Sequence, residues 1–322
     1  NEAYFNGKKA RPFSNEVLGR IENQSTPDML SNTYWPDELF RTAPMTQHNL
    51  SLTGSRERLN YMLSVGYQLQ DGIMKGTDAD RIQFRLNLSS DIYSWLRVGT
   101  NISAWQKNRT APLVGATGSD GLMNEICFAS PLCPVRYSDG RYATAIDQIT
   151  NMPYVNNPMQ MAEISKETQE NNILSKFFAD FSILKNLKLS TNISYLFSNE
   201  STKSFNPQII NYDYSGVNAT TTVAHSVLSK TFTKNTQLNS ETTLTWDETF
   251  ARLHNVKVLA GYSYLRYETN YDASSIQDFA DNSIQVPDAG SSNAKFGGYQ
   301  NAFSLQSVFG RINYNYSEKY LF

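Results

Sequence analysis

The chain has 322 residues, a formal net charge of −2, and only 18% charged against 12% aromatic residues. A near-neutral balance lacks the basic excess that is typical of nucleic-acid-binding domains. No run of about 18 apolar residues occurs in the sequence, which excludes a membrane-spanning helix but not a membrane-spanning β-strand, where only every second residue must face lipid. The length suits two soluble domains, or one large β-barrel or a part of one.

The first 45 residues are polar and irregular, and we expect them to form one loop segment ahead of a barrel portion at 46–322. Pro12, Pro27, Pro36 and Pro44 interrupt any long element, so only a short helix is expected, around 14–21. No charged and then apolar leader follows Asn1. We therefore expect either a removed leader or a piece of a longer protein.

The first strongly patterned segment is 58–70, where large apolar residues alternate with small or polar ones. Leu63 and Val65 share one face, and Ser64 and Gly66 share the other, because successive side chains of a strand point to opposite sides. At about twelve residues, the segment is roughly twice the usual strand of a soluble domain. A tilted strand that crosses a bilayer needs about 9–11 residues and presents this apolar-out, polar-in dyad.

The same alternation recurs along the chain and predicts about nine strands, with the start of another at Tyr320. They are expected at 47–53, 58–70, 80–90, 95–107, 173–184, 187–198, 231–246, 254–267 and 303–316. Tight turns alternate with long loops near 108–170, 199–230 and 268–300; a shorter connection at 71–79 is the exception.

The alternation of tight turns with long loops is typical of an up-and-down outer-membrane barrel whose long loops are extracellular. About nine strands with open edges cannot close in lipid, so the fold class expected is all-β, an antiparallel transmembrane barrel wall that is part of a larger barrel.

Five segments then identify a family resemblance. YWPDELFRTAPMTQHNLSLTG (34–54), the segments 59–88, 95–103 and 130–142, and FGRINYNYSEKYLF (309–322) resemble the SusC/RagA family of TonB-dependent outer-membrane transporters. Cys133 stands where the family pattern has a larger, often aromatic residue.

The resemblance implies a 22-stranded barrel in the bacterial outer membrane, filled by a plug domain that this chain does not match. It also implies uptake of oligosaccharides or peptides, energised through TonB by way of the plug. A SusD-like lipoprotein would cover the extracellular opening.

No catalytic constellation is present, since His48, His225 and His254 lie far apart and no nucleophile motif occurs. We therefore expect no enzyme activity, no cofactor and no metal site. Two cysteines, Cys127 and Cys133, either pair in an oxidising compartment or remain separate thiols.

Candidate contacts for substrate or partner lie on the wall and in the loops. For each of them, packing or lining of a water-filled wall is the alternative. The wall candidates are Arg97, Asn101 and Trp105; the loop candidates are Tyr34, Trp35, Tyr137, Tyr142, Tyr154, Tyr212 and Tyr214. The polar residues expected to face inward are Asn60, Gln68, Gln83, Arg85, Asn87, Arg97, Asn101, Asn192, Gln237, Asn239, Glu241 and Lys257. The aromatic residues expected to form girdles at the bilayer interfaces are Tyr93, Trp95, Trp246, Tyr267 and Tyr316.

Two other functions stay open at this stage. One is a passive porin, which shares the wall but lacks a plug. The other is a secreted carbohydrate-binding or adhesin β-domain, in which the same aromatic residues would stack on sugars. The membrane-wall and soluble-domain hypotheses make different predictions for four side chains, Leu63, Val65, Phe84 and Leu86. A membrane wall leaves them uncovered by protein, whereas a soluble fold buries them under a second layer.

Overall fold

The computed structural model describes residues 14–115, 121–143, 157–213, 215–216, 219–317 and 320–321. Most of them form one antiparallel sheet of ten strands, of which nine are long and β12 (Tyr320–Leu321) is short. The long strands are β1 (Met45–Arg56), β2 (Leu59–Asp71), β3 (Asp78–Tyr93), β4 (Leu96–Pro112), β5 (Ser165–Leu184), β6 (Leu187–Asn206), β9 (Val227–Phe250), β10 (His254–Phe279) and β11 (Gly290–Tyr316). Each strand pairs with the next along the sheet, so the predicted strands and their up-and-down order are confirmed.

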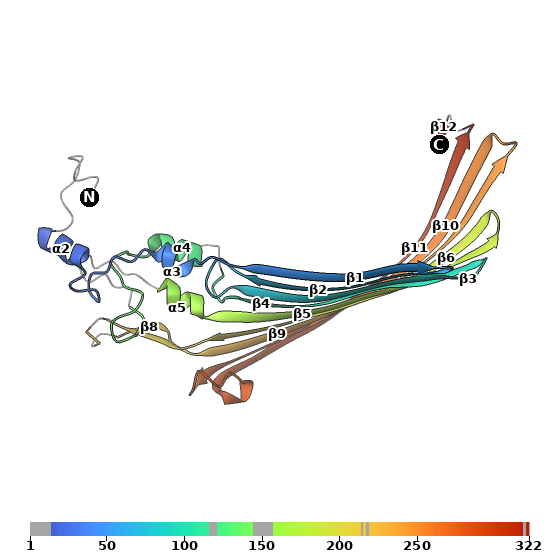
Figure 1. Ribbon diagram of the computed structural model, residues 1–322. Helices are drawn as coiled ribbons and strands as arrows, with labels where there is room; N and C mark the ends of the chain where they lie inside the picture. The colour runs from blue at the N-terminus through green and yellow to red at the C-terminus, as the bar shows by residue number, and fades with distance from the viewer. Residues whose placement is uncertain are drawn as a thin grey trace.

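The tight turns all lie at one end of the sheet, and the longer connections lie at the other (Figure 1). The loop end carries the remaining elements: α2 (Asn15–Asn23), α3 (Trp35–Leu39), α4 (Leu122–Phe128), α5 (Pro158–Glu163), the hairpin β7 (Ile209–Tyr212) with β8 (Ala219–Val223), and the 3-10 helix η1 (Pro287–Ala289). Helix α2 coincides with the short helix expected from the sequence, and the Ser14 hydroxyl caps it by accepting from the Val17 amide at 3.2 Å. None of the described helices has both the length and the hydropathy needed to cross a membrane.

The strands are longer than the sequence pattern indicates, and one expected loop is largely strand. Strand β10 continues to Phe279 and β11 begins at Gly290, so the connection is only 280–289 instead of 268–300. Toward the loop end of β10 and β11, polar residues become common on both faces, so the dyad contrast weakens. Backbone pairing continues nonetheless, from Glu268↔Ala302 up to Phe279↔Gly290.

The register places the large apolar side chains of neighbouring strands on one face, which we call the outer face. Leu63 lies opposite Leu86 and Val65 opposite Phe84. Val65 is 42% exposed and Phe84 is 37% exposed, and no described element covers them as a second layer. An uncovered apolar face on a continuous sheet is the property of a membrane-spanning wall, because water would penalise such a surface. The sheet is therefore a fragment of a transmembrane barrel wall.

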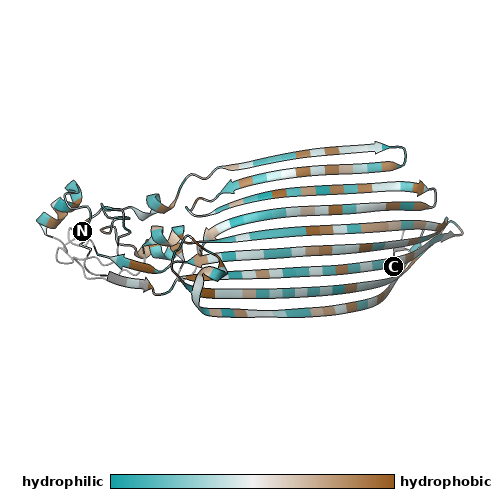
Figure 2. Ribbon diagram, turned by 90° about the horizontal axis from the view of Figure 1, so that it is seen from below, coloured by the Kyte–Doolittle hydropathy of each residue, from teal (hydrophilic) through white to brown (hydrophobic). Residues whose placement is uncertain are grey.

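The apolar residues of the outer face form a band that on most strands ends before the loops begin; Phe232 and Phe296 are exposed apolar residues above it. On β6 the band runs from Leu187 to Phe197, about eleven residues, which matches a tilted strand in a bilayer. Asn199, Ser201 and Lys203 continue the same face above it. Figure 2 shows the same division, with hydrophobic residues concentrated in the half of the sheet nearer the tight turns.

Aromatic residues mark the turn side of the band, as the sequence predicts. Tyr93 stacks on Trp95 with ring centroids 5.5 Å apart, and Trp246 lies 5.9 Å from Phe250. Tyr267 does not fit the girdle interpretation: it lies on the opposite, inner face, where its hydroxyl donates to Asn235 Oδ1 at 3.0 Å. The error arises because sequence position alone gives the height of a residue and not its face.

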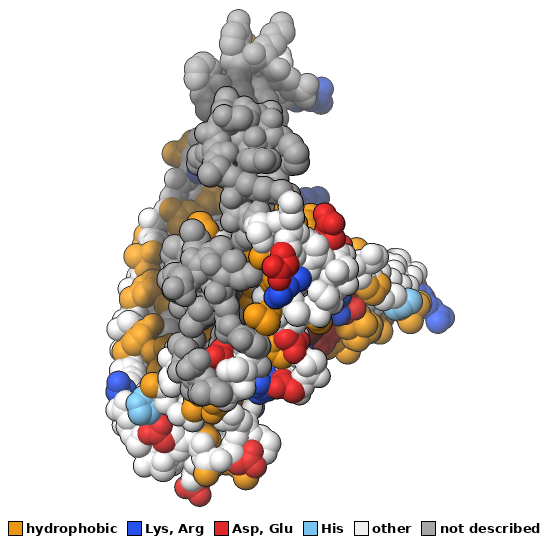
Figure 3. Space-filling model, turned by 90° about the vertical axis from the view of Figure 1, so that its left-hand side faces the viewer, with side chains coloured by type: hydrophobic (Ala, Val, Ile, Leu, Met, Phe, Trp, Pro, Cys, Tyr) orange, Lys and Arg blue, Asp and Glu red, His pale blue; other side chains and the backbone are white. Residues whose placement is uncertain are grey.

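The buried core of the described chain lies at the loop end and not within the sheet. Two apolar clusters join α3, α4, α5 and the segment 129–143, and we call this assembly the loop platform. Their buried members are Trp35, Ala129, Cys133, Tyr137 and Ala143 in one, and Leu39, Met74, Leu122 and Ala162 in the other. Seen from the loop end, charged side chains lie on the described loop surface and hydrophobic ones follow the flank of the sheet (Figure 3).

Candidate functional site

The inner face of the sheet is built by register alone. Because side chains alternate along every strand, the pairings Asn87↔Asn101 and Asn192↔Glu241 put polar residues from distant segments on one surface. All twelve residues expected to face inward fall on this face in the ladder. Such a surface can hydrate a channel or hydrogen-bond a polar solute, and it carries no reactive group.

Arg97 and Asn101, two of the three wall candidates, line one groove of the inner face near the tight turns. The groove has a volume of ≈ 620 Å³, and residues of β1 to β5 line it, Asn60 and Phe178 among them. Arg97 donates a hydrogen bond to the Ser89 hydroxyl at 3.2 Å. The structure thus brings the two candidates together in one open depression, which polar and apolar side chains line together.

Trp105 lies on the same face, further toward the loops. It is opposite Gln83 on β3 and Asn172 on β5, and it is half-buried. The guanidinium carbon of Arg81 is 5.6 Å from its ring centroid, within the range of a cation–π contact. Its inward direction agrees with the sequence interpretation.

Trp35 and Tyr137 pack in the loop platform. Trp35 is 3% exposed, and its indole Nε1 donates to the Ser130 carbonyl at 2.9 Å. Tyr137 is 7% exposed and belongs to the same cluster. Their burial favours the packing alternative for both. Tyr34, beside Trp35, is 66% exposed and stays on the surface.

The two cysteines are not bonded to each other, so the pairing alternative is not realised. Cys127 is exposed near the end of α4, where its Sγ donates to the Met123 carbonyl at 3.2 Å. Cys133 is buried in the cluster with Trp35. The helix therefore carries one thiol outward while the following turn carries the other inward.

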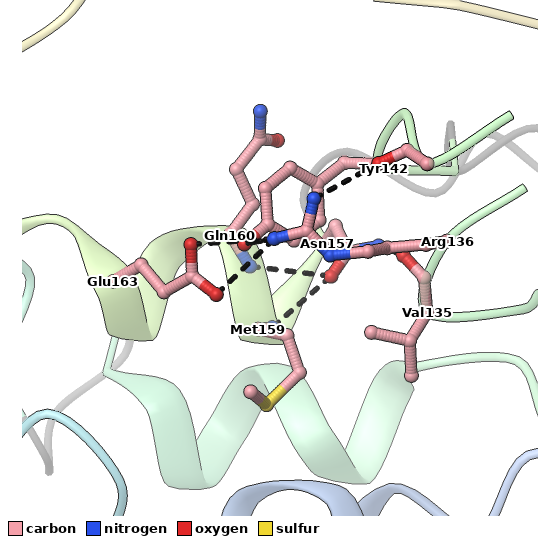
Figure 4. Close-up of polar contacts among 8 residues, drawn as sticks. Val135, Arg136, Tyr142, Asn157, Met159, Gln160 and Glu163 are labelled. Carbon is pink, nitrogen blue, oxygen red and sulfur yellow. Dashed lines mark hydrogen bonds and ion pairs between the residues drawn. The ribbon is translucent and has the colours of Figure 1, made fainter.

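Tyr142 belongs to a polar cluster at the edge of the loop platform (Figure 4). The guanidinium of Arg136 stacks over the Tyr142 ring at 3.6 Å, bonds to its hydroxyl, and pairs with Glu163 at 3.3 Å. Burial, and next a hydrogen bond with Glu163, raise the pKa of Tyr142. The phenol therefore stays protonated, and the cluster holds Arg136 in one orientation.

Asn157 holds this cluster to the rest of the platform. It is 1% exposed, and its side-chain amide donates to the carbonyls of Val135 and Ala143 at 2.9 and 3.4 Å. Its Oδ1 accepts from the amides of Met159 and Gln160, which caps α5. Asn157 thus joins α5 to both sides of the segment 135–143 (Figure 4).

Tyr212 is connected to the platform through Arg141. The Arg141 guanidinium carbon is 5.6 Å from the ring centroids of both Tyr137 and Tyr212, and it pairs with Asp139 at 2.6 Å. Hydrogen bonding from Arg141 lowers the pKa of Asp139. Two loops that are far apart in sequence are joined here. Tyr154 and Tyr214 lie outside the described residues.

A second contact ties the β8–β9 connection to β10. His225 Nδ1 lies 2.7 Å from Asp278 Oδ1, and the Ser292 hydroxyl also bonds to that carboxylate. The Asp278 amide in turn donates to the Ser226 carbonyl at 3.0 Å. Hydrogen bonds from Ser292, and next from His225, lower the pKa of Asp278.

Sequence reasoning missed the residues that hold the loops together, Arg136, Arg141, Asn157 and Glu163. One signal was present: Asn157 followed by Pro158 is the pattern of a helix N-cap and first turn. The other three depend on contacts between distant segments, which no local pattern reports. Within the described ranges, no group of three or more His, Cys, Asp and Glu side chains is arranged to hold a metal ion.

Comparison with known proteins shows what this arrangement resembles. No family model matches the chain. The TonB-dependent receptor P3 of Formosa agariphila is 25% identical over 299 residues, 91% of this chain and 29% of that protein. The TonB-dependent receptor SusC of Bacteroides thetaiotaomicron is 31% identical over 117 residues, 35% of this chain and 11% of SusC. The structure of the RagAB peptide importer in the open-open state superposes with a TM-score of 0.71 at 21% identity, over 88% of this chain and 31% of that one.

The chain is SusC/RagA-like. The closed-closed state of RagAB gives the same result, with a TM-score of 0.70 at 20% identity. The expected resemblance and the barrel-wall fold class are confirmed.

The SusC/RagA-like chain spans about a third or less of the proteins it matches. These proteins are named as receptors and importers.

Proposed function

We propose that the chain is part of the wall of a bacterial outer-membrane nutrient importer, with the loop end outside the cell. The observation that carries the proposal is the division of β2 to β4 into an uncovered apolar outer face and a predominantly polar inner face. Similarity to TonB-dependent receptors over most of the chain supports it.

Transport would be active, driven by TonB through a plug in the remainder of the protein. Displacement of such a plug would open a path along the inner face. Arg97, Asn101 and Trp105 offer charge, amide groups and an aromatic surface on this path, which suit oligosaccharides or peptides. RagAB, a structural relative of this chain, is a peptide importer.

A SusD-like surface lipoprotein is the proposed partner at the loop end. The loop platform is internally packed by two apolar clusters, yet it leaves Tyr34 66% and Phe128 73% exposed. Large exposed apolar side chains on a fixed surface are typical of protein contacts. These two residues are the proposed centre of the contact with the lipoprotein.

Uptake by the full-length protein in its native host tests the proposal. Labelled oligosaccharides and peptides of graded size should enter wild-type cells and be excluded when TonB is removed. Uptake that persists without TonB would establish a passive porin instead. A secreted adhesin would remain soluble and monomeric without detergent, which the uncovered apolar band opposes.

A further inference from the structure

Three lysines of the outer face lie above the apolar band without an ion-pair partner. Lys203 on β6 and Lys230 on β9 are directly opposite each other in the ladder, and Lys234 lies lower on β9. Among the described residues, none of the three forms an ion pair, and Lys234 instead lies over the Phe197 ring with its Nζ at 5.8 Å from the centroid. Like charges directly opposite on a sheet are destabilising. Lys203 has Glu167 opposite it on its other side, but Lys230 has Ser274 there, so Lys230 faces no carboxylate across either ladder.

The height of these lysines can be measured from Phe197, the last apolar residue of the band on β6. Lys234 lies opposite Asn199, two residues above Phe197, and Lys203 lies six residues above it. With a rise of roughly 3.3 Å per residue and a tilt of about 40°, these positions are about 5 Å and about 15 Å beyond the hydrocarbon.

Polar grooves surround Lys203 on the outer face. One, of ≈ 370 Å³, runs over β4, β5 and β6 and includes Asn108, Gln169 and Ser201. A second, of ≈ 360 Å³, shares Lys203 and reaches Asn282 and Gln285 of the β10–β11 connection. Glu167 lines both grooves and lies directly opposite Lys203 on β5, but no ion pair joins the two side chains.

We call the three lysines and the two grooves beside Lys203 the outer collar, and we propose that it binds the headgroup of an anionic glycolipid of the outer leaflet. A phospholipid headgroup layer is only about 5–7 Å deep, which reaches Lys234 but not Lys203 or Lys230. A lipid that carries phosphates and, beyond them, an anionic saccharide is long enough to reach both Lys234 and the pair Lys203 and Lys230. The amide and hydroxyl groups of the grooves then accept and donate hydrogen bonds to sugar hydroxyls, while the lysines neutralise phosphate or carboxylate.

The inference uses the membrane placement in the proposed function but not the transport activity. The full-length protein should therefore be extracted from its own membrane as wild type and as the triple variant Lys203→Gln, Lys230→Gln, Lys234→Gln. The matched control replaces Lys107, Lys166 and Lys176, which lie on the inner face, with Gln and removes the same charge. Co-purified lipopolysaccharide per protein is measured in each.

The amount of lipopolysaccharide that co-purifies with the outer-face Gln variant should be lower than with wild type by about fivefold or more. The inner-face control should retain as much as wild type. Replacing the same three lysines with Arg keeps the charge and should restore lipopolysaccharide retention. That result would show that the Gln variant loses lipopolysaccharide through its missing charge and not through misfolding. Vesicles of purified lipopolysaccharide should raise the melting temperature of wild type more than vesicles of phosphatidylglycerol do.

Equal retention in the outer variant and wild type would overturn the inference. Equal stabilisation by phosphatidylglycerol would overturn the saccharide part, and loss of the lipoprotein with unchanged lipopolysaccharide would assign the collar to protein contact instead. Uptake measured on the same variants separates this outcome from a failure of the transport proposal.

Discussion

Phe178 lies directly across the β4–β5 ladder from Gly99, and its ring fills the space that a side chain at position 99 would occupy. A Cβ at this position would meet the Phe178 ring at 2.4 Å and the Leu88 carbonyl oxygen at 2.6 Å. The same relationship joins Gly261 to Phe309 on the inner face. Glycine therefore allows an aromatic ring to lie flat on the wall.

Gly99→Val should destabilise the sheet by about 1–3 kcal/mol through overpacking. Because the Leu88 carbonyl belongs to the backbone, removing the ring by Phe178→Ala should restore only part of the loss. Denaturant unfolding in detergent measures both variants. Gly297→Val is the control, since nothing lies within 4 Å of a Cβ there; equal effects at 99 and 297 would contradict the account.

Asn157→Ala should loosen the segment 135–143 by leaving the carbonyls of Val135 and Ala143 without their side-chain donor and α5 without its cap. Loss of a buried hydrogen-bonding group costs about 1–3 kcal/mol. Hydrogen exchange of the Tyr137 amide, which donates to the Arg141 carbonyl, should accelerate. Gln160→Ala, a neighbouring change that keeps the backbone bond to Asn157, should leave exchange unchanged.

The contact between Asp278 and His225 should respond to acid. Because the folded state lowers the pKa of Asp278 from 3.8, its contribution is present above that value and is lost as the pH falls below it. Hydrogen exchange of the Asp278 and Phe279 amides, both bonded to Ser226, should therefore lose protection as the pH falls below about 4. Asp278→Asn should reduce this pH dependence. A dependence that survives unchanged would assign it to other carboxylates.

Replacing Tyr34 and Phe128 with alanine should weaken capture of the lipoprotein partner, because both side chains are exposed on the loop platform. Interface hot spots of this kind contribute about 2 kcal/mol or more each. Co-purification of the full-length variant with its lipoprotein measures the effect. Ile284→Ala serves as a control, since Ile284 is exposed on the β10–β11 connection and not on the platform. Undiminished capture in the double variant would place the contact elsewhere.

The number of long strands and the two faces of the sheet could be predicted from the sequence, because the alternation of residues such as Leu63 and Ser64 is visible within a single strand. It failed for the strand ends, where Asn270 and Asp272 lie on the outer face beyond the lipid and no longer contrast with their neighbours. It also failed for the loop platform. The bond from Trp35 to Ser130 spans 95 residues, and a contact of that kind leaves no periodic trace.

Lipid exposure of the outer face tests the central claim most directly. Single cysteines replace Val65, Phe84, Ser64 or Arg85 in the full-length protein, with Cys127→Ser and Cys133→Ala to remove the two thiols of this chain, and each is labelled with a fluorophore. Nitroxide on lipid acyl chains should quench the label at 65 and 84, whereas aqueous iodide should quench it at 64 and 85. The reverse pattern, or iodide quenching at all four positions, would contradict a membrane-spanning wall.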